Sequence, residues 1–252
     1  MEAHMPNGSD DGAFSPGNID FNAFYRGGAA LPGTGFVLDV VPWGIDGPQP
    51  VLVALEESGR LSGDILDAGC GLGENALYLA GRGHRVTGFD AASGALEQAR
   101  ARAASRGLDV TFVQADATTL DGVQQQFDTV VDSALYHCLD GVQRTAYSAA
   151  LHRVTRPGAQ LHLFCFADVT WPGFSLPVMT VSQDDLHAHL DEHWQISGIE
   201  LMDYATAFTR QYLQEHQADL EKAGISVEPG ALRTDDAGRA LAPMWKLHAV
   251  RR

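Results

Sequence analysis

From residue 64 onward the sequence alternates short apolar runs with helical stretches, and this order of elements is its strongest constraint on the fold. The runs that predict strands lie at residues 64–68, 85–90, 109–114, 127–132, 160–167, 194–202 and 244–250. The stretches that predict helices lie at residues 74–82, 91–106, 142–155 and 182–192. Because successive parallel strands need long crossover connections, the pattern predicts an α/β fold with a mostly parallel sheet and helices on both faces.

Two boundaries in this pattern carry local signals. Ser182 is expected to cap the helix at 182–192, with Asp185 in its first turn, where a negative charge suits the helix dipole. The sequence Arg156-Pro157-Gly158 is expected to end the helix at 142–155 and to form a turn before the next strand.

Composition limits the kinds of partner. The chain carries 17 Lys and Arg against 32 Asp and Glu, a formal charge of −15, which argues against binding to nucleic acid or to an anionic membrane surface. No apolar run approaches the roughly 20 residues that span a bilayer. Cys70, Cys138 and Cys165 are too few and too scattered for a disulfide framework or a zinc site, and no metal site is predicted. We therefore expect a cytoplasmic protein, with a monomer and a homodimer both open.

The N-terminal part differs in composition from the rest. Residues 1–20 are polar, acidic and rich in glycine, without an apolar signal segment, and they predict a flexible tail. Residues 21–60 are expected to form a cover or lid, and residues 61–252 a single domain.

A glycine-rich loop follows the first strand of the alternating region. The run from Asp67 to Gly73 has glycine at 69, 71 and 73, which permits a tight turn and close approach of a ligand to the backbone. The helix that follows directs its N–H groups toward the same place. A dinucleotide fingerprint requires glycine at position 74, but Glu74 is there, and a negative side chain suits a pyrophosphate poorly.

Two further acids follow the next strands. Asp90 ends the second strand, where a carboxylate can accept hydrogen bonds from both hydroxyls of a ribose. Asp116 and Ala117 follow the third strand, where a carboxylate and a backbone N–H can meet the edge of an adenine ring. These strand-end acids and the glycine loop, without a phosphate-binding lysine, predict a nucleoside ligand that lacks phosphates. S-adenosylmethionine has these parts.

The residues from about 64 to 167, with the sequences DAGCGLGENALYLAGRGHRVTGFDAA, FVQAD and FDTVVDSALYHCL, resemble the class I S-adenosylmethionine-dependent methyltransferases. The resemblance implies a Rossmann-like seven-stranded sheet whose last strand is antiparallel. It also implies that the cofactor is held by Asp67, Gly69, Cys70, Gly71, Gly73, Asp90, Ala91, Asp116, Ala117, Asp132 and Ser133.

A narrower resemblance lies upstream, in residues 20–26 and 42–50, and in the sequence VDSALYHCL. These segments are similar to the heterocyclic toxin methyltransferases, which methylate hydroxylated nitrogen heterocycles such as N-hydroxyquinolones. The resemblance implies methyl transfer to a hydroxyl oxygen, or a nitrogen, of a small aromatic heterocycle, and a role in detoxification. Two alternatives stay open: a methyltransferase for thiols, thiopurines or chalcogens, and a non-catalytic S-adenosylmethionine-binding regulatory protein.

Two residues after the fourth strand are candidates for catalysis. His137 is the preferred general base because histidine titrates near neutrality, and Asp132 is the alternative. A positioned base contributes about 10²–10⁴-fold, roughly 3–5 kcal/mol, whereas positioning contributes roughly 7–11 kcal/mol. Positioning and a closed pocket are therefore expected to dominate the reaction.

Aromatic residues on either side of the domain are candidates for the walls of the site. Tyr25 and Trp43 in the expected cover are predicted to contact the cofactor, and Tyr25 also the acceptor. The remaining residues predicted to contact the acceptor are Phe36, His137, Trp171, Phe174 and Met179.

Overall fold

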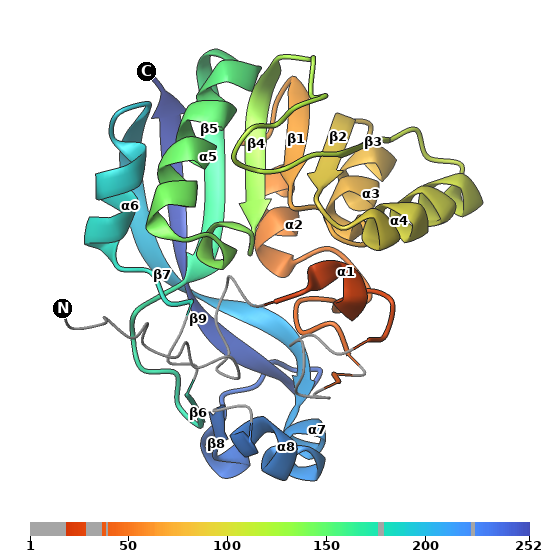
Figure 1. Ribbon diagram of the computed structural model, residues 1–252, viewed down its shortest axis with the longest axis vertical. Helices are drawn as coiled ribbons and strands as arrows, with labels where there is room; N and C mark the ends of the chain where they lie inside the picture. The colour runs from red at the N-terminus through yellow and green to blue at the C-terminus, as the bar shows by residue number, and fades with distance from the viewer. Residues whose placement is uncertain (1–18, 29–36, 39, 176–178, 223–224) are drawn as a thin grey trace, which may run out of the picture.

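A computed structural model describes residues 19–28, 37–38, 40–175, 179–222 and 225–252. Its centre is a seven-stranded sheet in the order β3-β2-β1-β4-β5-β9-β7 (Figure 1). The strands are β1 (Asp64–Ala68), β2 (Arg85–Asp90), β3 (Thr111–Gln114), β4 (Phe127–Ser133), β5 (Thr155–Phe166), β7 (Trp194–Thr209) and β9 (Arg239–Arg251). The first five pair in parallel, and β9 is antiparallel to both β5 and β7. The predicted Rossmann-like sheet with an antiparallel last strand is confirmed.

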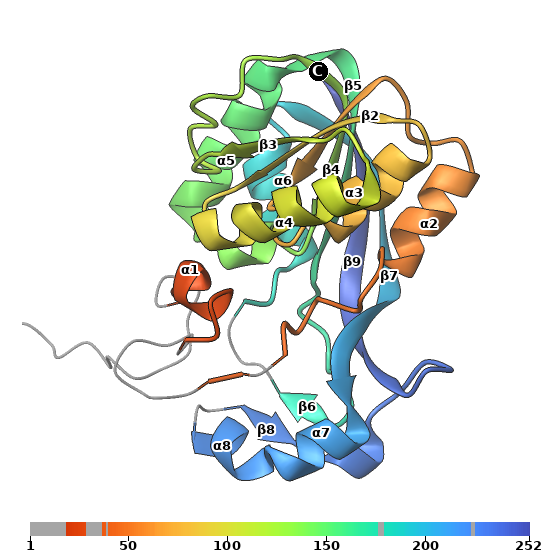
Figure 2. The ribbon, with the colours of Figure 1, turned by 90° about the vertical axis from the view of Figure 1, so that its right-hand side faces the viewer.

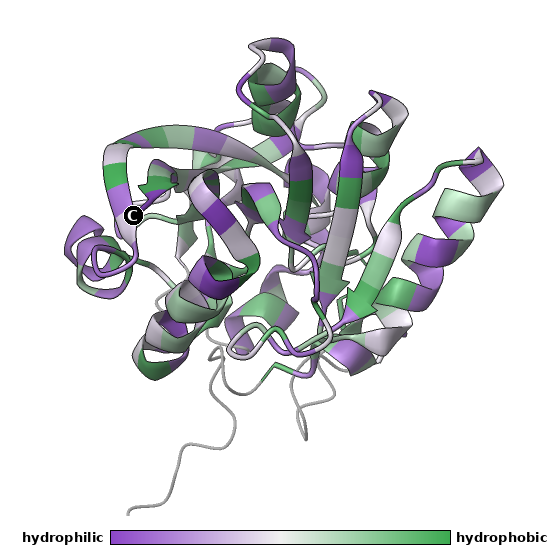
Figure 3. Ribbon diagram, turned by 90° about the horizontal axis from the view of Figure 1, so that it is seen from above, coloured by the Kyte–Doolittle hydropathy of each residue, from purple (hydrophilic) through white to green (hydrophobic). Residues whose placement is uncertain are grey.

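Helices cover both faces of the sheet (Figure 2). One layer contains α2 (Pro50–Glu57), α3 (Glu74–Gly81) and α4 (Ser93–Arg106), whose buried leucines and alanines share a cluster with Ile65 and Val131. The other contains α5 (Gly141–Val154) and α6 (Gln183–Leu190), packed against Leu161 and Leu163. Figure 3 shows hydrophobic stretches in the central strands and mixed faces on the surrounding helices, as burial of one helix face requires.

The two predicted boundaries have different outcomes. Ser182 caps α6 and accepts a hydrogen bond from Asp185 N at 3.0 Å, as predicted. The helix α5 also ends where expected, but β5 begins at once at Thr155, so the predicted turn at residues 156–158 is wrong. The pairing of β4 with β5 shifts register between Phe127 and Thr129, and this irregularity takes up the proline and glycine within the strand.

Strands β7 and β9 are much longer than predicted and run beyond the sheet into a small lower lobe (Figure 1). The lobe contains β6 (Phe174–Ser175), α7 (Arg210–Glu215), α8 (Gln217–Lys222), β8 (Ser226–Val227) and the 3₁₀ helix η3 (Pro229–Ala231). Its core includes Phe208, Leu213 and Leu220. The polar sequence at residues 211–222 thus contains two buried leucines, Leu213 in α7 and Leu220 in α8, which pack these short helices into the lobe.

The described part of the N-terminal segment lies beside the carboxyl ends of the strands. It contains α1 (Phe21–Phe24), and Gln98 of α4 donates a hydrogen bond to Tyr25 O at 3.0 Å. Pro42 O accepts a hydrogen bond from Ala207 N of β7 at 2.7 Å, so this segment connects the helix α4 with the edge strand β7. Leu52 of α2 is buried in the same core cluster as Ile65 of β1, so α2 packs with the sheet. No helix among the described residues is long and apolar enough to cross a membrane.

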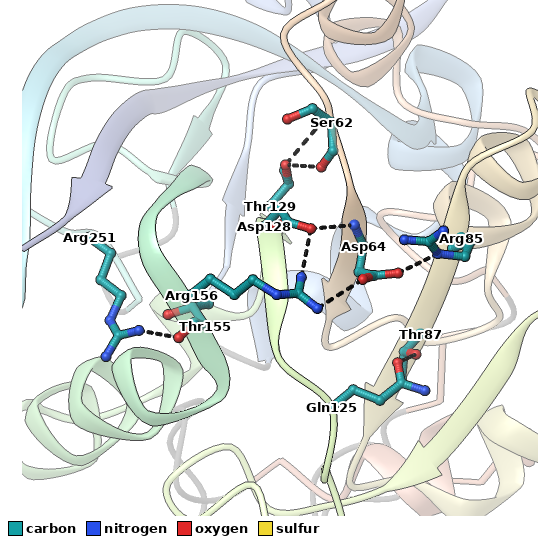
Figure 4. Close-up of polar contacts among 10 residues, drawn as sticks. All are labelled: Ser62, Asp64, Arg85, Thr87, Gln125, Asp128, Thr129, Thr155, Arg156 and Arg251. Carbon is teal, nitrogen blue, oxygen red and sulfur yellow. Dashed lines mark hydrogen bonds and ion pairs between the residues drawn. The ribbon is translucent and has the colours of Figure 1, made fainter.

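An ion-pair network links the amino ends of β1, β2, β4 and β5 (Figure 4). Arg156 of β5 reaches Asp128 of β4 at 2.7 Å and Asp64 of β1 at 3.1 Å, and Arg85 of β2 pairs with Asp64 at 2.5 Å. Hydrogen bonds from Arg85 and then Arg156 hold the pKa of Asp64 below its ordinary value. These ion pairs therefore hold the amino ends of the strands together, and the carboxyl ends are left free for a ligand.

Replacing Arg156 with alanine should lower the free energy of unfolding by about 1 kcal/mol at pH 7, because it removes two partly exposed ion pairs. That loss corresponds to a fall in Tm of about 2–4 °C in thermal unfolding. The folded-state pKa of Asp64 is lowered, so its contribution is present above pH about 4 and is lost as the pH falls below that value. The difference between Arg156→Ala and the parent should therefore shrink at pH 3. Lys222→Ala, which breaks the exposed pair with Asp219, serves as the control and should change stability by less than about 0.5 kcal/mol. An equal loss at both pH values would contradict the electrostatic explanation.

Candidate active site

The glycine loop between β1 and α3 has a backbone that favours glycine. Gly69, Gly71 and Gly73 have φ values of +64°, +50° and +82°, in the left-handed region. A Cβ at Gly69 would lie 2.8 Å from Leu135 Cβ, and one at Gly71 would lie 2.6 Å from the hydroxyl of Tyr25. Glycine is thus favoured in this loop by the left-handed backbone and, at Gly69 and Gly71, also by close contacts that leave no room for a Cβ.

Asp90 lies where the sequence predicts, at the end of β2. Its two carboxylate oxygens accept hydrogen bonds from Gly71 N and Ala92 N, each at 2.8 Å. Burial raises the pKa of Asp90, and these backbone donors oppose the rise. Asp90 therefore joins the glycine loop to the start of α4, and its side chain lines the cavity described next.

A cavity at the strand ends, here named the strand-end cavity, extends over β2, β3 and β4. Among the predicted cofactor contacts, it is lined by Tyr25, Trp43, Gly69, Asp90, Ala91, Ala117 and Ser133. The remaining lining residues, not predicted from the sequence, are Phe21, Phe89, Ala115, Ala134, Leu135 and Cys138. Most of these are apolar, with Asp90 among the few polar groups, a combination that suits a flat ring and a hydroxyl-bearing sugar.

A second cavity, here named the loop cavity, continues from the first along the glycine loop. The two share Trp43, Gly69 and Ser133, and the predicted residue Cys70 lines only the second. The other lining residues come mainly from the segment before α2, the start of α3, the helix α4, the last part of β7 and the start of β9. They include Gln49, Glu74, Asn75, Arg102, Tyr204 and Arg239. This cavity is more polar than the strand-end cavity and suits a charged group.

A third cavity, here named the apolar cavity, lies between the N-terminal segment and the lower lobe. Of the predicted acceptor contacts, His137, Trp171, Phe174 and Met179 line it, and Phe36 lies outside the described residues. Sequence reasoning missed most of its wall, including Phe21, Phe24, Tyr204, Phe208, Leu220 and Ile225. Phe21, Trp43 and Ala134 line both this cavity and the strand-end cavity.

The junction of the three cavities is held by hydrogen bonds between side chains. Trp43 lines all three, and its indole N–H donates to the Tyr25 hydroxyl at 2.9 Å. The hydroxyls of Ser133 and Tyr204 are 2.8 Å apart. Ala134 has a φ of +80°, a strained conformation for a residue with a Cβ, and such strain is typical of functional sites.

Five predicted cofactor contacts, among them Gly71 of the glycine loop, do not line any of the three cavities. Asp132 is fully buried, and it accepts hydrogen bonds from Leu135 N at 2.9 Å and from the Tyr147 hydroxyl at 2.9 Å. Burial raises its pKa to about 7. With its oxygens engaged in this way, Asp132 shapes the turn after β4, and this geometry gives no support to its predicted roles as base and cofactor contact.

Of the other four, Gly71 faces the hydroxyl of Tyr25, as described above, and the remaining three have local contacts of their own. Asp116 is exposed and accepts hydrogen bonds from the backbone and hydroxyl of Thr118, at 2.7 and 2.6 Å. A Cβ at Gly73 would approach Ala99 and Phe112, so this glycine faces the packing of α4 and β3. Asp67 is buried beneath the loop; burial raises its pKa to about 7, although the N–H of Ala76 opposes the rise.

His137 lies in the 3₁₀ helix η2 (Tyr136–Cys138), at the wall of the apolar cavity. Its Nδ1 accepts a hydrogen bond from Phe166 N at 3.2 Å, and its ring stacks on that of Phe166 with centroids 4.2 Å apart. Burial, with a smaller effect of Arg144, lowers its pKa to about 3. The neutral ring therefore carries its proton on Nε2, which makes His137 a hydrogen-bond donor and a weak base.

Comparison with known proteins identifies the family. Residues 65–158 match the model of a methyltransferase domain. A 2-heptyl-1-hydroxyquinolin-4(1H)-one methyltransferase from Mycobacteroides abscessus is 38% identical over 159 residues, which cover 63% of this chain and 70% of the relative. The chain belongs to the S-adenosylmethionine-dependent methyltransferases.

Two solved structures are also similar to this methyltransferase. One, from work on the conversion of a disulfide bond into a thioacetal group during echinomycin biosynthesis, is 34% identical with a TM-score of 0.70, and the match covers 92% of this chain and 91% of that one. A magnesium protoporphyrin IX methyltransferase from Synechocystis, solved with S-adenosylmethionine bound, shares the fold at 20% identity with a TM-score of 0.53, over 80% of this chain and 76% of that one. The enzyme is thus a small-molecule methyltransferase whose cofactor is S-adenosylmethionine.

The described residues fit this cofactor. Asp67 Oδ2 is buried without a hydrogen-bond partner, and an orphaned carboxylate oxygen favours a positively charged ligand group nearby. Gly69 leaves open the space that a Cβ would fill at the wall of the strand-end cavity. The site therefore combines a nucleoside-shaped cavity with an unpaired carboxylate oxygen buried beneath the glycine loop.

Replacing Gly69 with alanine should weaken binding of S-adenosylhomocysteine by at least about tenfold, because the new methyl group meets Leu135 and displaces the cavity wall. Isothermal titration calorimetry measures this affinity. Gly59→Ala is the matched control, since Gly59 has a similar φ of +69° but no atom within 4 Å of its Cβ position. The control should show the cost of backbone strain in its Tm and leave the affinity unchanged; equal affinities in the two variants would contradict this role of Gly69.

Proposed function

We propose that the enzyme transfers a methyl group to the hydroxyl oxygen of a small aromatic nitrogen heterocycle such as a 1-hydroxy-4-quinolone. The observation that carries the proposal is the apolar cavity, which is walled by aromatic rings and adjoins the strand-end cavity at Phe21, Trp43 and Ala134. A flat apolar ring matches such a wall, and its few polar groups can orient one oxygen. The 1-hydroxyquinolinone methyltransferase from Mycobacteroides abscessus supports this choice of acceptor.

In this proposal the strand-end cavity holds the adenosine part of S-adenosylmethionine. Asp90 accepts hydrogen bonds from the ribose hydroxyls through lone pairs that its backbone contacts leave free, and Ala117 and Leu135 contact the adenine. Tyr25 and Trp43 cover the junction of the cavities and exclude water. When bound, the cofactor supplies a methyl group that is already activated on a positively charged sulfur.

The acceptor lies in the apolar cavity, with Trp171 and Phe174 against its ring. Their own ring centroids are 4.3 Å apart, which makes a continuous aromatic wall. His137 donates from Nε2 to an oxygen of the acceptor and orients it, rather than removing its proton. The hydroxyl of an N-hydroxy heterocycle is acidic enough to be ionised largely in solution, so the protein mainly positions it. Methylation would remove this ionisable hydroxyl, which is the chemical basis for proposing detoxification.

The direct test incubates the enzyme with S-adenosylmethionine and a panel of N-hydroxyquinolones, hydroxyquinolines and the corresponding parent heterocycles without the hydroxyl. We expect a product heavier by one methyl group only from the hydroxylated compounds, with fragmentation in mass spectrometry placing the methyl on oxygen. The parent heterocycles are the matched controls. Turnover of parent and hydroxylated compounds at equal rates would overturn the choice of oxygen.

The pH dependence of kcat/KM should follow the acceptor and not the enzyme. Since the pKa of His137 is lowered to about 3, the residue stays neutral from pH 5 to 9 and adds no inflection there. The rate should rise until the hydroxyl of the acceptor is ionised, and the inflection should move when a substituted acceptor of different pKa is used. An inflection near pH 6–7 that is fixed for every acceptor and disappears in His137→Phe would instead indicate a histidine base. One that persists in this variant would belong to another group, such as the buried Asp67 or Asp132, whose pKa values are raised to about 7.

His137→Phe separates the same two roles, because it keeps a ring to stack on Phe166 and removes the donor. Loss of one neutral hydrogen bond should lower kcat/KM by about tenfold. A loss of 10²–10⁴-fold, restored at high pH, would show that the residue acts as a base.

A sulfur acceptor is the second candidate, and one observation favours it. The solved structure from echinomycin biosynthesis, where a disulfide bond becomes a thioacetal, matches this chain nearly end to end at 34% identity. A soft sulfur nucleophile needs no base and fits an apolar cavity equally well. Thiophenols and thiopurines added to the panel distinguish the candidates. A higher kcat/KM for the hydroxylated heterocycles supports the oxygen acceptor, and a higher kcat/KM for the thiols supports the sulfur acceptor.

A further inference from the structure

Gln49 lies just before α2 and is not among the residues predicted from the sequence to bind a ligand. Its side chain is 3% exposed, and it lines the loop cavity. The backbone N–H of Gln49 donates to the Asn75 side chain at 3.2 Å, which fixes it beside the first turn of α3. Gln49 therefore stands between the N-terminal segment and the glycine loop.

The orientation of its amide follows from its partners. The Nε2 group donates to Trp43 O at 3.2 Å and to Ala205 O at 3.1 Å. Two carbonyl oxygens can be satisfied only by the NH₂ end of an amide, so the side chain cannot be flipped. The oxygen Oε1 must point away from both carbonyls.

That oxygen is buried and has no hydrogen-bond donor within the described structure. A buried acceptor without a donor costs about 1–3 kcal/mol, and native proteins rarely leave one unpaired without a reason. The charged side chains nearby offer no donor to it: Arg102 pairs with Glu74, and Arg239 pairs with Asp235 at 2.7 Å. A ligand group that donates hydrogen bonds would satisfy it.

We propose that Gln49 Oε1 accepts a hydrogen bond from the amino group of S-adenosylmethionine. The loop cavity joins the strand-end cavity at Gly69 and Ser133, so a cofactor with its adenosine in the latter places its amino-acid end in the former. The amino group is a cation with three N–H donors. Asp67 Oδ2, the other orphaned acceptor of the site, belongs to a residue whose carboxylate meets Ala76 N, one residue beyond the Asn75 contact of Gln49.

In this proposal Gln49 is a positioning residue that contacts one functional group of the cofactor, its amino group. The test uses calorimetry with three ligands that need no turnover: S-adenosylhomocysteine, its analogue with hydrogen in place of the amino group, and 5′-methylthioadenosine, which lacks the whole amino-acid end. Each is titrated into the full-length parent, Gln49→Leu and Gln98→Leu. Gln98 is the matched control because its Nε2 also bridges two backbone carbonyls, Tyr25 O and Gly94 O, but it is exposed and lines none of the three cavities.

The parent should bind S-adenosylhomocysteine about 10- to 100-fold more tightly than the analogue without the amino group, as a hydrogen bond to a charged group predicts. In Gln49→Leu this preference should fall to within about threefold, while 5′-methylthioadenosine binds as in the parent. Gln98→Leu can weaken all three ligands alike, because Gln98 anchors the backbone of Tyr25, but it should keep the full preference for S-adenosylhomocysteine over the analogue.

Three outcomes would overturn the proposal. The first is a parent that does not discriminate between S-adenosylhomocysteine and the analogue, a result that needs no variant to fold. The second is a Gln49→Leu protein that keeps the parent's preference, which would point to another acceptor such as Asp46 at the exposed rim of the cavity. The third is an equal loss for 5′-methylthioadenosine, which would make Gln49 only an anchor for the Trp43 segment. If Gln49→Leu does not fold, Gln49→Met is used in its place.

Discussion

The hydrogen bond from Trp43 to Tyr25 is the contact on which the site depends, because Trp43 lines all three cavities. No single element holds this pair. Gln98 of α4 anchors the backbone of Tyr25, and Gln49 anchors that of Trp43 while also bonding to Ala205 of β7. The N-terminal segment is thus tied to the helix α4 and to the edge strand β7 by a few side-chain amides.

Much of the fold could be predicted from the sequence because its signals are local. The alternation of strands and helices, the glycine loop and the acid at the end of β2 each depend on neighbouring residues and on the period of the apolar pattern. Asp90, Ala91 and Ala117 were therefore found at the cavity wall. The family resemblance added Tyr25 and Trp43, which lie before the sheet and carry no such periodic signal.

The rest of the site depended on contacts between residues far apart in the chain. Tyr204, Leu220 and Ile225 read as ordinary strand or helix residues, yet the extension of β7 and β9 carries them to the apolar cavity. Asp132 shows the opposite case: its place at the end of β4 suggested a catalytic role, but the hydroxyl of Tyr147 from α5 donates a buried hydrogen bond to its carboxylate. Sequence position identifies the strand end, whereas the direction of a side chain there is set by partners from other elements.

The protonation state of His137 bears on whether the protein or the acceptor would account for proton loss in the proposed reaction. Burial in an apolar wall lowers its pKa to about 3, and the Phe166 N–H occupies the lone pair that a base would use. Both effects come from the same packing that makes the cavity a good wall for an aromatic ring. With no strong base in this apolar wall, the proposed acceptor is one that is already ionised in solution or that needs no ionisation. Methyl transfer cancels the positive charge of the donor against the negative charge of such an acceptor, so an apolar site stabilises the charge-dispersed transition state relative to the separated ions. Under the proposed function, selectivity would come from the shape and apolar lining of the cavity, and the acceptor would lose its proton through its own acidity.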